Sequence, residues 1–259
     1  MVTAMPRPAV PVVLVTGFEP FGGDTVNPSW EVARRLDGWE VARAETGGGG
    51  VGDGGGSGGG VLAVVRAILL PCVFHTALDV LNGAIDRHRP VAVVGLGLAG
   101  SRRDISVERI AINVDDARIP DNAGRQPIDQ PVHARAPAAY WSTLPIKAIV
   151  AALQEAGIAA SVSQTAGTFV CNHVFFGLAH RLASRRRRAP PAAQAGGSAA
   201  VTADSPRSGF IHVPWPAAER QASPGATLDL ETMVQAIRIA VRITLTAETD
   251  RLLGGGALE

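Results

Sequence analysis

Two short, unbroken apolar runs, each followed by a glycine, constrain this chain more than any other feature. Residues 12–16 lead into Gly17, and residues 91–94 lead into Gly95. Apolar runs without polar alternation are typical of strands that are buried on both faces of a sheet. We therefore expect two central strands that end at their glycines, in a sheet that is covered on both sides.

Apolar residues recur at helical spacing between and after these strands, for example at Leu78, Leu81 and Ile85. Strands that alternate with helices predict an α/β fold, in which helices cover both faces of a largely parallel central sheet. Ligands of such sheets bind at the carboxyl ends of the strands. The expected helices are 29–36, 76–88, 144–156 and 230–245, and two further strands are expected at 61–70 and 159–163.

The composition bounds the function. The chain has 259 residues, is 46% hydrophobic, and carries 24 basic against 23 acidic side chains. A net charge this close to zero gives no long-range attraction for nucleic acid or for an acidic membrane. No apolar run approaches the roughly 18 residues of a membrane span, so we expect a cytoplasmic protein whose cysteines are reduced.

Two segments have the composition of insertions. Residues 47–60 are nearly all glycine, and residues 185–206 are mainly Arg, Ala, Pro, Gly and Ser. Neither segment can bury enough apolar surface to offset the entropy lost on ordering. We expect a single domain over residues 1–259, interrupted by these insertions, with the arginines at 185–188 in a solvated loop.

Cys171 is the candidate nucleophile. It follows a small-residue turn and two apolar residues, at the expected first turn of a helix. Partial positive charge at a helix start would stabilise a thiolate and lower the pKa of the thiol. Simple burial is the commoner fate of a lone cysteine, and it is the interpretation we give to Cys72. Two cysteines provide no disulfide framework and no thiolate cage, and we expect neither a metal nor a cofactor.

A thiol nucleophile needs a base, and the chain offers six histidines. His212 is the one polar residue within an apolar run that ends at Pro214, which fits a catalytic histidine at a strand end and a structural core histidine equally well. His173 is two positions from Cys171, so its side chain is expected on a different face of the helix, at its surface or behind the site. The other four are expected to be structural or exposed, with one near a helix C-terminus: His75, His88, His133 and His180.

Two further motifs leave alternatives open. Gly95, Gly97 and Gly100 match the dinucleotide-binding pattern G-x-G-x-x-G, but that pattern needs a following helix and residues 102–113 favour an extended chain. A nucleotide-binding α/β protein is therefore a minor hypothesis. Residues 104–122 interleave charges with isoleucines, which fits either a polar edge strand with solvated charges or a partly buried charged site.

Four motifs together carry a family resemblance. They lie at 16–28, 105–122, 163–172 and 209–214. In this order, over residues 12 to 245, they resemble the pyroglutamyl peptidase I family, also called pyrrolidone-carboxylate peptidases. The resemblance implies a three-layer α/β/α sandwich with a twisted central sheet. It also implies a cysteine peptidase that releases N-terminal pyroglutamate (5-oxoproline) from peptides through a thioacyl-enzyme, and that assembles as a homodimer or homotetramer.

The resemblance also implies the roles of individual residues. Cys171 would be the nucleophile, His212 its base, Glu108 the carboxylate that orients His212, and Arg118 a neighbour of the developing oxyanion. Leu98 stands where many relatives have glutamine, so a side-chain contact would be lost there while a backbone carbonyl contact would remain. The alternative is a noncatalytic peptide-binding relative that retains the pocket. The residues matching the family's pocket for the lactam ring are Phe18, Phe21, Asn27, Leu98, Phe169 and Val170.

Overall fold

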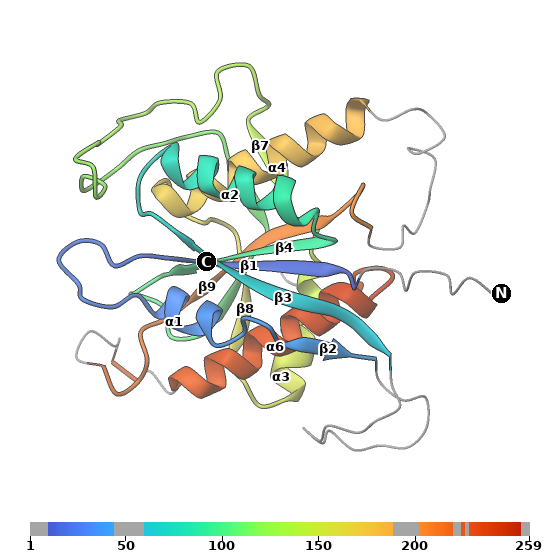
Figure 1. The fold of residues 1–259 in the computed structure, drawn as a ribbon. Helices are drawn as coiled ribbons and strands as arrows, with labels where there is room; N and C mark the ends of the chain where they lie inside the picture. The colour runs from blue at the N-terminus through green and yellow to red at the C-terminus, as the bar shows by residue number, and fades with distance from the viewer. Residues whose placement is uncertain (1–9, 44–59, 189–201, 220–223, 226–227, 255–259) are drawn as a thin grey trace.

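A seven-stranded sheet forms the centre of the molecule, with the strand order β2-β3-β1-β4-β9-β5-β8. The computed structural model describes residues 10–43, 60–188, 202–219, 224–225 and 228–254, so most of the two expected insertions lies outside the described residues (Figure 1). Neighbouring strands are parallel except at the β2–β3 and β5–β9 pairs. The strands are β1 (Val12–Phe18), β2 (Glu40–Ala42), β3 (Val61–Leu70), β4 (Ala92–Leu98), β5 (Ile105–Glu108), β8 (Ala160–Ser163) and β9 (Arg207–Val213).

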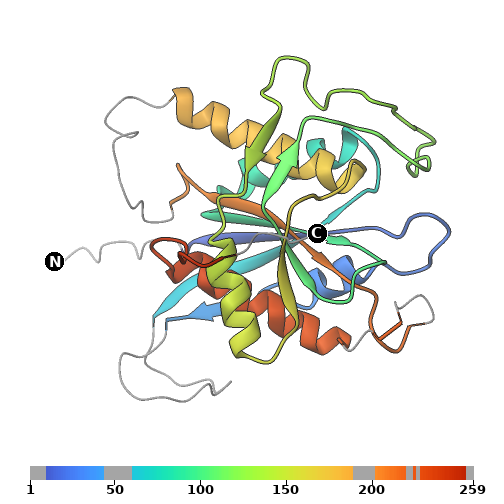
Figure 2. The ribbon, with the colours of Figure 1, turned by 180° about the vertical axis from the view of Figure 1, so that it is seen from behind.

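Helices cover both faces of this sheet, as predicted. Helices α2 and α4 lie on one face, and α1, α3 and α6 lie on the other (Figures 1 and 2). The buried apolar residues accordingly form two separate clusters, one on each side of the strands. A separate two-stranded antiparallel sheet of β6 (Ile110–Ile112) and β7 (Ala139–Trp141) lies beside α4. The helices are α1 (Pro28–Arg34), α2 (Thr76–His88), α3 (Ile146–Glu155), α4 (Val170–Arg188) and α6 (Leu230–Thr246).

The glycines that we expected to end β1 and β4 lie inside these strands. β1 continues past Gly17, and β4 continues past Gly95. A Cβ on Gly17 would lie 2.5 Å from the carbonyl oxygen of Ser29, and a Cβ on Gly95 would lie 2.5 Å from the ring of Phe210. The expectation was wrong because these glycines allow a close approach of neighbouring groups to the strand rather than a turn.

Two other expectations need correction. The arginines at 185–188 continue α4 instead of forming a loop, which agrees with the good helix propensity of arginine. Arg181 and Arg185 both pair with Asp86 of α2, so this helix is tied to its neighbour. His180 consequently lies in the middle of α4, not near its C-terminus. Within the described ranges, we find no helix that has both the length and the apolarity to cross a membrane.

Candidate active site

Cys171 lies in the first turn of α4, as predicted. Its sulfur is directed at β4, because a Cβ on Gly97 would lie 2.8 Å from Cys171 Sγ. Gly97 is paired in register with His212 on the adjacent strand β9. The absence of a side chain at Gly97 therefore lets the thiol approach the strand pair that carries His212.

His212 is held by a buried carboxylate. Its Nδ1 lies 2.7 Å from Oε1 of Glu108, and both side chains are almost completely buried. The antiparallel pairing of β5 with β9 places Ser106 opposite His212, and Glu108 follows on the same face of β5 two residues later. Since an ionised carboxylate can only accept, Nδ1 carries the proton and Nε2 is left to act as a base. The part of the charged stretch that contains Glu108 is therefore a buried site and not an edge strand, because β5 lies between β9 and β8. Asp116 and Arg118, further along the stretch, are exposed.

Arg102 is a member of this site that the sequence analysis did not identify. Its Nη1 donates to Oε1 of Glu108 at 2.6 Å, and its Nη2 donates to the carbonyl oxygen of Thr165 at 2.8 Å. The guanidinium supplies the opposite charge that a buried carboxylate requires, and it anchors the segment that leads to Cys171. In the sequence, Arg102 resembles its neighbour Arg103, and only the fold separates the two.

Burial raises the pKa of the Cys171 thiol, and the nearby Cys72 and Glu108 raise it further. Arg102 and a backbone hydrogen bond act in the opposite direction, but their effect is smaller. The expected lowering of this pKa at a helix start is thus outweighed by desolvation. A raised pKa favours the protonated thiol, so a base that removes its proton would assist attack. Cys72 is buried, as expected, and burial with Glu19 and Asp121 nearby raises its pKa to about 12.

Four of the residues expected to line the pocket join one apolar cluster with Cys171. Phe18 and Val170 are fully buried within it, while Phe21 and Phe169 are partly exposed. The rings of Phe21 and Phe169 lie 6.0 Å apart, centroid to centroid. These two rings are the accessible aromatic surface next to the thiol. Leu98 is half-buried at the carboxyl end of β4, next to Gly97.

Asn27 and Arg118 are placed differently from the apolar residues. Asn27 caps α1: its Oδ1 accepts from the backbone N–H of Ser29 at 3.1 Å, and its Nδ2 donates to the carbonyl of Glu19 at 3.0 Å. The side chain of Asn27 therefore stabilises the start of α1 and the loop after β1. Arg118 has an exposed side chain. Its segment is tied to the chain before Cys171, because Asp116 and Thr168 exchange bonds of 2.9 Å and 2.7 Å.

His173 is fully buried, so only the first of its two expected placements, at the helix surface, was wrong. Its Nδ1 lies 2.8 Å from Oδ2 of Asp115, and its Nε2 accepts from the backbone N–H of His75 at 3.0 Å. Both ring nitrogens are occupied, and His173 cannot serve as the base. The dinucleotide hypothesis also fails, because the chain after Gly100 turns and enters β5 instead of opening a helix.

Sequence similarity to known proteins extends over nearly the whole chain. The sequence profile described as pyroglutamyl peptidase matches residues 12–49 and 58–247. The pyrrolidone-carboxylate peptidase of Chromobacterium violaceum is 51% identical over 247 residues, which cover 95% of this chain and 98% of that protein. The corresponding protein of Cupriavidus taiwanensis is 48% identical over 250 residues, which cover 96% of this chain and 100% of that protein.

Solved structures of pyroglutamyl peptidases are also similar to this chain over nearly its whole length. Pyroglutamyl peptidase I from Bacillus amyloliquefaciens has a TM-score of 0.74 and 39% identity, over 95% of this chain and 100% of that one. A mutant pyrrolidone carboxyl peptidase from Pyrococcus furiosus has a TM-score of 0.72 and 35% identity, over 90% of this chain and 98% of that one. The likeness therefore includes both the sheet and the helices that carry the candidate site.

Proposed function

This chain belongs to the pyroglutamyl peptidase family, and from that premise we propose that Cys171, His212 and Glu108 carry out its reaction. Membership makes the chain a cysteine-type peptidase that removes pyroglutamate from the N-terminus of peptides. One observation carries the assignment of residues. The Cys171 sulfur lies against Gly97, the register partner of His212, while His212 donates to Glu108.

The proposed reaction uses His212 as a proton carrier. Nε2 of His212 takes the proton of the Cys171 thiol while the sulfur bonds to the pyroglutamyl carbonyl carbon. The carbon–nitrogen bond of the resulting oxyanion then breaks, and the leaving amine takes the proton from His212. Water attacks the thioester, again giving a proton to His212, and the carbon–sulfur bond breaks. The thiolate recovers that proton, and free pyroglutamate leaves. Glu108 holds the imidazole in the tautomer that this cycle needs.

The start of α4 supplies stabilisation for the oxyanion. Backbone N–H groups in the first turn of a helix carry partial positive charge and have no partners within the helix. The N–H of Cys171 is one of these groups, and preorganised donors of this kind are typically worth a few kcal/mol in the transition state. Arg118, on the segment bonded to Thr168, is proposed as a second source of positive charge.

The proposed lactam pocket lies in the apolar cluster around Phe21 and Phe169. A pyroglutamyl ring is small, flat and uncharged, so aromatic walls with a few amide partners suit it. We place Phe18 and Val170 behind these walls and Leu98 at the end of β4, where its backbone carbonyl can accept from the lactam N–H. An unmodified N-terminal glutamate would enter this pocket charged and without a partner, and desolvation would exclude it.

Arg102 is proposed as a positioning residue. It shares one Glu108 oxygen with His212, so it fixes the carboxylate that orients the base. Its second bond, to the carbonyl of Thr165, holds the segment that precedes Cys171. Loss of Arg102 would therefore affect the base and the nucleophile together.

Three broader features are also proposals. The expected single domain is supported by one continuous sheet over the described residues. A cytoplasmic location is supported by two free cysteines. A homodimer or homotetramer would cover exposed apolar side chains such as Ile128 and Trp141, both 67% exposed. Light scattering coupled to size exclusion would measure the assembly.

A hydrolysis assay with three substrates tests the function. Pyroglutamyl, prolyl and glutamyl amides of the same fluorescent amine would be compared in reducing buffer, with and without a chelator. We expect release of the amine from the pyroglutamyl amide alone, at the same rate with chelator present. Equal turnover of the prolyl amide, or no turnover of any of the three, would contradict the proposal.

A further inference from the structure

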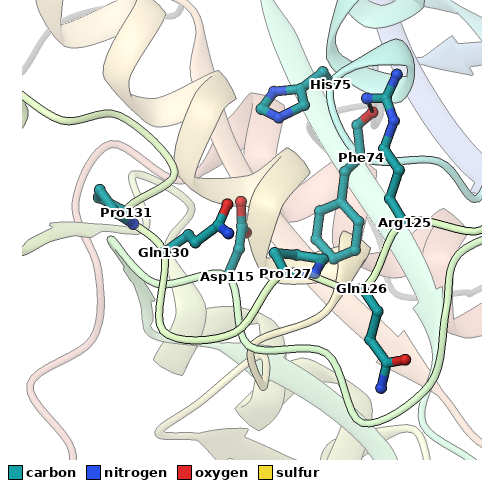
Figure 3. A pocket seen from close by; sticks show the side chains of 8 residues that line it. All are labelled: Phe74, His75, Asp115, Arg125, Gln126, Pro127, Gln130 and Pro131. Carbon is teal, nitrogen blue, oxygen red and sulfur yellow. Dashed lines mark hydrogen bonds between the residues drawn. The ribbon is translucent and has the colours of Figure 1, made fainter.

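A cavity lies beside the proposed site and is lined by none of its reacting residues. Its volume is about 320 Å³, at the small end of the range for small-molecule sites. Its walls come from the turn before α2 and from the segment 115–131 (Figure 3). A single amino acid or a short peptide would fill it. The lining residues are Phe74, His75, Asp115, Arg125, Gln126, Pro127, Gln130 and Pro131.

One oxygen in this cavity lacks a donor. Asp115 is only 3% exposed, and its Oδ2 accepts from His173 at 2.8 Å. Its Oδ1 is also buried, yet no described residue donates to it. A buried carboxylate oxygen without a partner is costly, and a native structure that keeps one needs a reason. In Figure 3 the Asp115 carboxylate points into the space between Gln130 and Phe74. A ligand that donates a hydrogen bond would satisfy this oxygen.

The neighbouring histidines leave the charge of Asp115 in place. Nε2 of His173 accepts from the backbone N–H of His75, so the proton of that ring is on Nδ1 and the ring is neutral. Burial lowers the pKa of His75, and the nearby His173 and Arg125 lower it further against the opposing effect of Asp115 and Asp79. The lowered pKa favours the neutral form of His75, and the accepting Nε2 of His173 carries no proton, so neither imidazole brings a positive charge to the carboxylate.

The second charge of the cavity is positive and lies at its exposed part. Arg125 has an exposed side chain, and its Nη1 donates to the carbonyl oxygen of Phe74 at 3.2 Å. Phe74, Pro127 and Pro131 provide the apolar part of its wall. A buried negative group, an apolar wall and an exposed guanidinium together match a small zwitterion.

We propose that this cavity binds the free amino terminus of an amino acid or short peptide, whose ammonium group donates to Oδ1 of Asp115 and whose carboxylate faces Arg125. The source of such a ligand rests on the proposed function, because cleavage after pyroglutamate releases a product with a new amino terminus. The ring of Phe74 contacts the ring of Phe169 edge to face at 5.4 Å. The cavity and the proposed lactam pocket thus share a wall.

Calorimetric titration of the wild-type protein tests this binding. The ligands are L-leucine, L-leucinamide, N-acetyl-L-leucine and L-leucyl-L-leucine. We expect N-acetyl-L-leucine, which lacks the ammonium group, to bind at least about tenfold more weakly than L-leucine, as loss of a charged hydrogen bond predicts. L-leucinamide is expected to bind more weakly than L-leucine but to be unaffected by Arg125→Gln. Comparison of L-leucine with its dipeptide distinguishes an amino acid ligand from a peptide ligand.

Asp115→Asn tests most directly whether Oδ1 accepts a hydrogen bond from the ligand. Its amide oxygen can still accept from His173 while its NH₂ group takes the place of Oδ1, so the shape is retained and the polarity is reversed. We expect it to lose L-leucine binding by at least about tenfold, whereas the control Asp116→Asn, at an exposed neighbouring aspartate, keeps it. If Asp115→Asn does not fold, the ligand series and Arg125→Gln still test whether the cavity binds an amino terminus.

Two outcomes would overturn the proposal: equal affinity for L-leucine and N-acetyl-L-leucine, or no binding of L-leucine and its dipeptide at millimolar concentration. Turnover of a pyroglutamyl amide is measured on the same preparation. Turnover without binding contradicts only the cavity proposal, and binding without turnover contradicts only the proposed function.

Discussion

Arg102 and His212 donate to the same oxygen of Glu108, at 2.6 Å and 2.7 Å. A carboxylate held by a guanidinium cannot rotate without breaking a charged hydrogen bond, so the orientation of the imidazole depends on Arg102. The other oxygen of Glu108 is buried and has no partner among the described residues. Every hydrogen bond that the described residues make to the Glu108 carboxylate therefore goes to Oε1.

Arg102→Gln should lower kcat by about 10- to 100-fold, the size expected for losing one or two charged hydrogen bonds, with a smaller change in KM. Arg102→Lys should recover part of this loss, since it restores the charge but not both bonds. The matched control is Arg103→Gln, at an exposed arginine one position later. Steady-state kinetics with a pyroglutamyl amide measures all three variants. Equal kcat for Arg102→Gln and Arg103→Gln would contradict the positioning role.

Gly97→Ala should reduce both activity and stability. Its Cβ would lie 2.8 Å from Cys171 Sγ and 2.8 Å from the Phe210 ring, so the thiol or the ring must move. Overpacking of this kind typically costs about 1–3 kcal/mol. In the control Gly83→Ala, on α2, the new Cβ meets nothing within 4 Å, and it should leave stability unchanged or raise it by up to about 1 kcal/mol. Urea unfolding and the amide assay test both variants, and a fully active, stable Gly97→Ala would show that the thiol is not seated against β4.

Cys72 should make the folded state less stable in alkali. Its pKa is raised from 9.0 to about 12 in the folded protein. Between these values the unfolded chain releases a proton that the folded chain retains, so stability is lost as the pH rises above 9.0, by about 1.4 kcal/mol per unit. Below pH 9.0 the effect disappears, because both states hold the proton.

Cys72→Ala removes this titration. Urea unfolding at pH 8, 9 and 10 should show a shallower decline of the unfolding free energy with pH for the variant than for the wild type. The packing lost with the thiol lowers the unfolding free energy of the variant equally at all three pH values, so it does not affect this comparison. Parallel declines would contradict the buried, protonated state of Cys72.

The sequence predicted the order of strands and helices well, because apolar runs and helical spacing are local signals. The ranges expected at 61–70 and 76–88 coincide with β3 and α2. The strand ends predicted at Gly17 and Gly95 were wrong for a physical reason. A glycine that ends a strand and a glycine that admits a distant ring look alike in sequence, and Phe210 is far along the chain from Gly95.

The residues of the candidate site were likewise predictable from the sequence only in part. The histidine pattern alone left His212 undecided between core and catalysis, and only the family resemblance selected it. Arg102 has meaning only once folding brings Glu108 and Thr165 to its guanidinium. The pKa of Cys171 depends on burial, which the helix start at Val170 does not reveal.

The most direct test of the account is the rate at which Cys171→Ala releases a fluorescent amine from a pyroglutamyl amide, measured beside Cys72→Ala as the matched cysteine control. We predict that the first variant remains folded and loses at least about 10⁴-fold in kcat, as removal of a catalytic nucleophile does, while the second remains active. Wild-type turnover by folded Cys171→Ala would contradict the assignment of Cys171 as the nucleophile.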